Sequence, residues 1–190
     1  MAKVKLNPIL EQISGKVGDL VFKRYGDEVV LSQKPDLSGR EMSEAQLAAQ
    51  ERFRQAALYG KLVMADPETK SLYEDAAKAN GKPVFSLTVA DFFNAPSVDE
   101  IDLANYSGAI GDEIIVWASD DFAVVGVQVA LMNTHSQLIE SGQAVESPSA
   151  SGRWIYSATA YVEVGTIVRI AVRASDRPGG VGEAEEEKAL

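Results

Sequence analysis

Two apolar runs separated by a short polar break dominate the second half of the sequence. Residues 114–118 and 122–131 are rich in valine and isoleucine, and Ser119, Asp120 and Asp121 lie between them. Runs of this length and composition, bounded by turn residues, are typical of strands in the core of a β-sheet protein. This stretch therefore predicts that the residues around it fold as packed sheets.

Short segments with a period of two recur throughout the second half and are separated by turn residues. They cover 101–103, 113–118, 124–131, 137–144, 153–161 and 166–174. In the third segment Val125, Val127, Val129 and Leu131 are expected on one buried face. Strands at this spacing predict an antiparallel sandwich of the immunoglobulin type.

The first half has a different pattern. Residues 15–25 and 28–32 are β-rich and flank a Gly-Asp turn at 26–27, which predicts a hairpin. An isolated hairpin is only marginally stable in water, so this one is expected to pack against something.

About three helices are expected after the hairpin. Ser43, with Gln46 three residues later, has the capping-box pattern of a first helix. Asp66 followed by Pro67 predicts the start of a second helix. A third is expected from Pro83 onward, ending before Pro96. The short connections favour a compact helical bundle.

The charge changes where the pattern changes. Residues 1–96 contain 13 Lys and Arg against 13 Asp and Glu, whereas residues 97–190 contain 5 against 15. We therefore predict an α+β protein of two domains. A hairpin-plus-helical domain is expected at 1–96, a sandwich at 97–178 and an acidic tail at 179–190.

Composition excludes several classes of function. The chain has no cysteine, which rules out disulfides and thiolate chemistry. The acidic second half argues against nucleic-acid and anionic membrane partners. No signal peptide or membrane-spanning run is visible, so a cytoplasmic protein is the default, with export by another route or assembly into a particle left open.

Both halves resemble known domains. Residues 111–114, 118–122, 125–127, 154–156 and 172–179 make the second half similar to bacterial immunoglobulin-like and cadherin-like modules. Residues 15–18, 29–30, 45–46 and 52–53, with Pro35, make the first half similar to a family of uncharacterised bacterial domains. The second resemblance implies no chemistry.

A calcium site is one interpretation of the acidic residues. Cadherin-like modules use carboxylates between strands to bind Ca²⁺, which takes six to eight oxygen ligands. Asp120, Asp121 and Asp176 follow two strands that could end at the same side of a sandwich. The alternative is that Asp120-Asp121 simply forms a turn, in which case no cofactor is expected.

No catalytic constellation is predicted, so we expect no enzyme. His135 is the single histidine and lies in a predicted turn. Residues 15–18 contain the Gly-Lys pair of a phosphate loop but lack the required Ser or Thr and the following helix. The large aromatics are expected in the core and rim of the sandwich, as opposed to a sugar-binding platform; they are Trp117, Trp154, Tyr156 and Tyr161.

The leading hypothesis is a structural or assembly protein that associates with other proteins, most simply with copies of itself. The interaction residues are expected in the N-terminal strands, where a sheet edge pairs with a neighbouring chain. They are Val17, Leu20, Phe22, Val29 and Leu31. The alternative hypothesis is a module that binds carbohydrate or Ca²⁺.

Overall fold

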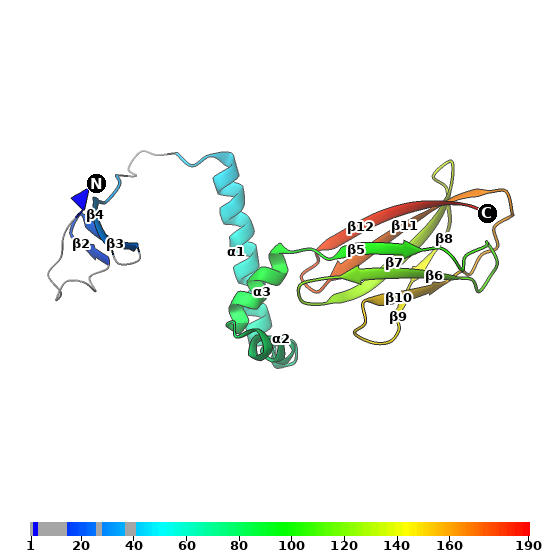
Figure 1. Ribbon diagram of the computed structural model, residues 1–190, viewed down its shortest axis with the longest axis horizontal. Coiled ribbons are helices and arrows are strands. Elements are labelled where there is room, and N and C mark those ends of the chain that lie inside the picture. Colours follow the sequence, from blue (N-terminus) through cyan, green and yellow to red (C-terminus); the bar gives the residue numbers. More distant parts are fainter. Residues whose placement is uncertain (1, 4–14, 26–27, 37–40) are drawn as a thin grey trace. The chain divides into compact units, whose positions relative to one another are not determined.

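A computed structural model describes residues 2–3, 15–25, 28–36 and 41–190 (Figure 1). It confirms the predicted α+β class and the β-sandwich. The chain divides into two compact units, 1–47 and 48–190. The first unit contains the N-terminal sheet, and the second contains most of the helical residues together with the sandwich, whereas the predicted division lies at residue 96. None of the helices in the described ranges is long and apolar enough to cross a bilayer.

The first unit contains a small antiparallel sheet. Its strands are β1 (Ala2–Lys3), β2 (Gly15–Val17), β3 (Leu20–Tyr25) and β4 (Glu28–Gln33), in the order β1-β4-β3-β2. The predicted hairpin is β3–β4, which pairs Phe22 with Leu31. The turn predicted at 26–27 lies outside the described residues.

Three helices follow, as the capping signals indicate: α1 (Glu44–Ala65), α2 (Pro67–Asn80) and α3 (Val84–Phe93). At the start of α1, the Gln46 amide donates to Ser43 Oγ and the Ser43 amide donates to Gln46 Oε1. The Asp66 carboxylate accepts the Thr69 amide at 3.0 Å. Gly81, with φ of 64°, ends α2 in the left-handed conformation that glycine tolerates.

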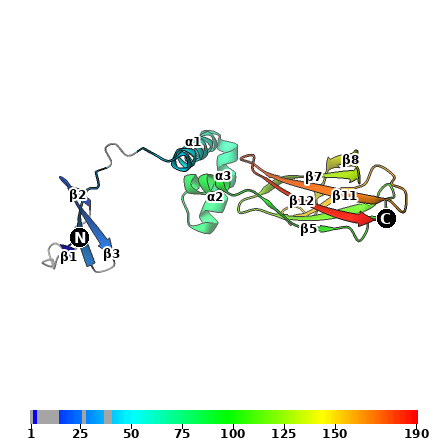
Figure 2. The ribbon, with the colours of Figure 1, turned by 90° about the horizontal axis from the view of Figure 1, so that it is seen from above.

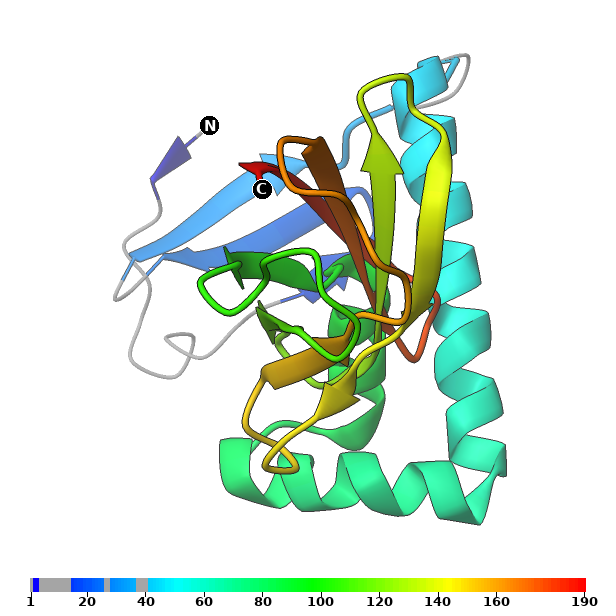
Figure 3. The same cartoon turned by 90° about the vertical axis from the view of Figure 1, so that its right-hand side faces the viewer.

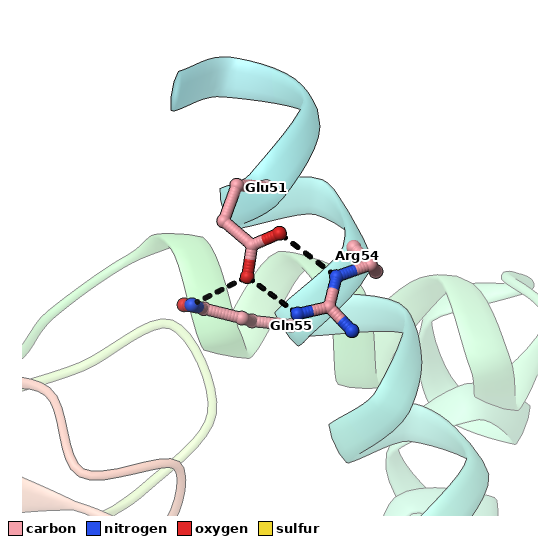
Figure 4. Close-up of polar contacts among 3 residues, drawn as sticks. All are labelled: Glu51, Arg54 and Gln55. Carbon is pink, nitrogen blue, oxygen red and sulfur yellow. Dashed lines mark hydrogen bonds and ion pairs between the residues drawn. The ribbon is translucent and has the colours of Figure 1, made fainter. Parts of the chain in front are cut away.

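One face of α1 carries an exposed polar cluster (Figure 4). Glu51 accepts from Arg54 Nε at 2.8 Å and Nη2 at 2.6 Å, and from Gln55 Nε2 at 3.1 Å. The hydrogen bond from Arg54 lowers the pKa of Glu51. Because the pair is solvent-exposed, it adds little to the free energy of unfolding.

The sandwich consists of two antiparallel sheets. One has the order β5-β6-β10-β9, the other β12-β11-β7-β8. Figure 3 views them from the end. The strands are β5 (Ser97–Asp102), β6 (Glu113–Ser119), β7 (Val124–Asn133), β8 (Leu138–Gln143), β9 (Val145–Glu146), β10 (Arg153–Ser157), β11 (Ile167–Asp176) and β12 (Val181–Ala189).

The two sheets enclose a core built largely from the inward side chains of these strands. Val127, Val129 and Leu131 of β7 are fully buried, as the alternation predicts. Val125 is not: its side chain is 47% exposed. The register shifts at the start of β7, where Gly126 pairs with Ser175 but Val124 pairs with Asp176. The unpaired Val125 is a bulge residue, so the alternation breaks there.

Two segments expected to lack structure are strands. Residues 179–190 were expected to form an acidic tail, but most of them form strand β12. This strand pairs with β11 along its length (Figure 2). Arg169 and Arg173 of β11 lie opposite Glu187 and Glu183, so the acidic residues face basic neighbours across the ladder. β5 likewise begins at Ser97, in a segment for which no strand was predicted before residue 101.

Candidate functional site

Three aspartates from separate segments meet where the helices join the sandwich. Asp91 lies in α3, Asp120 follows β6, and Asp176 is the last residue of β11. One carboxylate oxygen of each lies within 4.8 Å of the others. We call these three residues the carboxylate junction. The structure thus brings together two residues of the predicted metal set and adds Asp91, which the sequence analysis missed.

The strand pattern explains why Asp176 lies inside. Val168, Ile170, Val172 and Ala174 alternate inward along β11 and are buried. Asp176 continues this alternation and is 4% exposed. A carboxylate at an inward position of a strand is costly unless it is hydrogen-bonded or bound to a cation.

Each carboxylate of the junction has one bonded oxygen and one free oxygen. Asp91 Oδ2 accepts the Tyr73 hydroxyl. Asp120 Oδ2 accepts the Ala123 amide at 3.1 Å. Asp176 Oδ1 accepts the amides of Gly179 and Gly180. The other oxygens, Asp91 Oδ1, Asp120 Oδ1 and Asp176 Oδ2, are buried without a partner in the described part of the chain.

Aromatic and amide contacts hold the helices against the same loop of the sandwich. The ring of Tyr73 stacks on Phe122, with centroids 4.0 Å apart and planes at 7°. The Tyr59 hydroxyl lies 2.7 Å from the Tyr73 hydroxyl, which in turn donates to Asp91. Asn94 Nδ2 donates to Asp121 Oδ2 at 2.7 Å. Asp121, the third predicted metal ligand, therefore bonds to the end of α3.

Burial and neighbouring negative charges oppose the ionisation of Asp91 and Asp120. Burial raises the pKa of Asp91 to about 6, the bond from Tyr73 opposes this rise, and the charges of Asp120, Asp176 and Asp121 add to it. Burial also raises the pKa of Asp120. Burial and the bond to Asp91 raise the pKa of Tyr73, so its hydroxyl keeps its proton.

An open cleft adjoins the junction. It has a volume of about 490 Å³, and its lining includes Phe92, Gly179 and Gly180, which neighbour Asp91 or bond to Asp176. Arg52 also lines it, but its guanidinium donates to the Phe93 carbonyl at 3.3 Å and lies over the Phe93 ring. The cleft is thus lined by residues that neighbour the junction, while the three aspartates do not line it.

The N-terminal sheet places the predicted interaction residues together. Its register pairs Val17 with Leu20, Phe22 with Leu31, and Arg24 with Val29. Because directly opposed residues point to the same side of a sheet, Val17, Leu20, Phe22, Val29 and Leu31 share one face. We call these five residues the apolar face. Val29 is buried, whereas Val17 is 66% and Leu20 44% exposed.

The remaining candidates have ordinary structural roles. His135 is exposed in the turn after β7, and its amide donates to Asn133 Oδ1. Gly15 to Val17 form strand β2 and lead into β3, not into the helix that a phosphate loop requires. Trp154 and Tyr156 are buried in the core, while Trp117 and Tyr161 are exposed.

Comparison with known proteins finds a structural likeness for part of the chain. No protein family and no curated protein matches the chain. The solved structure of CopC from Methylosinus trichosporium OB3b is similar, with a TM-score of 0.37 and 11% identity. The likeness covers 48% of this chain and 89% of that one.

Proposed function

We propose that this chain is a non-enzymatic structural protein that associates with a second copy of itself through the apolar face of its N-terminal sheet. One observation carries the proposal: five apolar residues share a face of that sheet, and two of them are substantially exposed. Burial of apolar surface contributes about 25 cal/mol per Å², so covering such a face favours association.

The charge distribution supports a second copy as the partner. Residues 1–47 contain seven Lys and Arg and seven Asp and Glu, so this unit carries no net charge. The acidic sandwich, by contrast, repels a copy of itself. Like units therefore meet with least repulsion through their N-terminal sheets, and a two-fold contact between identical faces closes as a dimer.

The edge strand β2 offers a second kind of contact. It is only three residues long, and Val17 on it belongs to the apolar face. A neighbouring strand that adds at this edge extends the sheet and covers Val17 at the same time. Pairing at the β2 edge and packing on the apolar face would therefore both cover Val17.

Serine substitutions on the two faces of the sheet test the proposal. Val17→Ser with Leu20→Ser removes exposed apolar surface from the apolar face. Tyr25→Ser is the matched control, because Tyr25 is 64% exposed and lies on the opposite face. Sedimentation velocity is expected to show dimers for the parent chain and the control, and monomers for the double variant. Equal sedimentation of the double variant and the control would refute the proposal.

A further inference from the structure

We propose that the carboxylate junction binds a Ca²⁺ ion, which links helix α3 to the sandwich. This inference concerns residues 48–190 and is independent of association through the N-terminal sheet. It rests on the three buried, partnerless oxygens of Asp91, Asp120 and Asp176. A buried carboxylate oxygen without a donor costs free energy, and a bound cation removes that cost.

The hydrogen bonds of the three carboxylates match those of metal ligands. In each of the three carboxylates, one oxygen accepts a hydrogen bond from the surrounding structure and the other remains free. Metal ligands are commonly held by such outer contacts, which orient the side chain and leave one oxygen for the ion. Asp91 is 1% exposed and Asp176 is 4% exposed, so neither free oxygen is satisfied by bulk water.

The spacing favours Ca²⁺. Ligand oxygens lie about 2.3–2.6 Å from Ca²⁺, so two oxygens on opposite sides of the ion are about 4.6–5.2 Å apart. One carboxylate oxygen of each aspartate lies within 4.8 Å of the others, which meets this limit. Mg²⁺, with distances of about 2.0–2.1 Å, requires a tighter set. Water from the adjoining cleft would complete the coordination shell.

Arg177 follows Asp176 in the sequence, and its charge acts on the pKa of Tyr59, whose hydroxyl bonds to Tyr73 at the junction. None of the ion pairs formed within the described residues includes Asp91, Asp120 or Asp176. Arg52 is held by the carbonyl and ring of Phe93. An ion from solution or bound protons can balance the negative charge of the junction, and these two cases give different experimental results.

The role of the ion follows from the origin of its ligands. Asp91 comes from α3, whereas Asp120 and Asp176 come from opposite sheets of the sandwich. An ion held by all three cross-links the helical segment to both sheets. Binding should therefore order the helices on the sandwich and raise the stability of their contact.

Calcium titration of the full chain tests the site. Isothermal titration calorimetry of the chelator-treated protein is expected to show one Ca²⁺ per chain, with Mg²⁺ binding more weakly. Asp91→Asn and Asp176→Asn each remove a ligand charge with little change of shape, and each is expected to lower the Ca²⁺ affinity at least about tenfold, or about 1.4 kcal/mol. Asp121→Asn is the matched control, because it removes a charge of the same sign beside the junction but outside the proposed ligand set.

A second readout does not depend on heat. Tb³⁺ emission, excited through nearby tyrosines such as Tyr73, is expected to appear on binding, to be displaced by Ca²⁺, and to be lost in the Asp91 and Asp176 variants. Circular dichroism confirms that the variants are folded. The proposal is overturned if the parent chain gives no heat, Tb³⁺ emission or thermal shift up to about 10 mM Ca²⁺. Retention of parental affinity in both ligand variants would overturn it equally.

Discussion

Replacing Asp91 by asparagine should stabilise the cation-free protein. The raised pKa of Asp91, about 6, shows that the folded state binds this proton more tightly than the unfolded chain, whose pKa is near 3.9. The free energy of unfolding therefore falls as pH rises from about 4 to about 6, and the loss is complete above that window. Asparagine cannot ionise, so the free energy of unfolding of the Asp91→Asn variant does not fall with pH for this reason.

The size of this stabilisation follows from the raised pKa of Asp91. The pKa of Asp91 is about 6 in the folded protein and about 3.9 in the unfolded chain, a difference that corresponds to at most about 3 kcal/mol of stability. Solvent near the half-buried Asp120 screens the repulsion, so we expect a gain of about 1–3 kcal/mol. The asparagine carbonyl can still accept the Tyr73 hydroxyl, and its amide can donate to Asp120 or Asp176. The midpoint of thermal unfolding should rise by about 2–10 °C near pH 7.5.

The assay is thermal unfolding in a chelating buffer, followed by circular dichroism for the helices and by tryptophan fluorescence for the sandwich. Near pH 4 the difference between variant and parent should vanish, because both side chains are then neutral. With Ca²⁺ at a hundredfold excess over the parent's dissociation constant the difference should shrink, since the parent gains about 2.7 kcal/mol and a variant of tenfold lower affinity gains about 1.4 kcal/mol. A variant less stable than the parent in chelator near pH 7.5 would contradict the claim that ionised Asp91 destabilises the cation-free protein.

Three further substitutions probe individual contacts. Gly180→Ala places a Cβ in collision with Asp176 Oδ2, so calorimetry should show weakened Ca²⁺ binding without any change of charge. Gly60→Ala places a Cβ 2.7 Å from Thr88 Oγ1 and 2.8 Å from the Phe85 ring; overpacking should cost about 1–3 kcal/mol in urea unfolding, and an unchanged midpoint would contradict the packing of α1 on α3. Leu131→Ala should cost about 2–5 kcal/mol, well above the cost of Val125→Ala on the exposed bulge, as measured by the same denaturation.

Local patterns in the sequence predicted much of the fold. Alternation identified the buried face of β7, and capping residues located the starts of α1 and α2, because these signals act over a few neighbouring positions. The strand β12 was missed because its glutamates resemble a solvated tail. Its pairing partner is β11, in which Arg169 and Arg173 lie opposite Glu187 and Glu183, and this long-range pairing is not visible in the local sequence of β12.

The candidate site was predicted in part for a similar reason. Asp120 and Asp176 follow strands, and strand ends at one side of a sandwich are expected to meet. Asp91 lies in a helix among apolar residues, Val89, Phe92 and Phe93, and its sequence context resembles an ordinary helical position. One signal was available: an acid within the apolar stretch 84–93 must be exposed, paired or bound to a cation.

The most direct test of the proposed function is the solution mass of the full chain, measured by light scattering over a range of concentrations. The account predicts a mass above the 20.4 kDa of one chain, falling toward that value on dilution and after serine replaces Val17 and Leu20. A mass of 20.4 kDa at every concentration would contradict association through the N-terminal sheet.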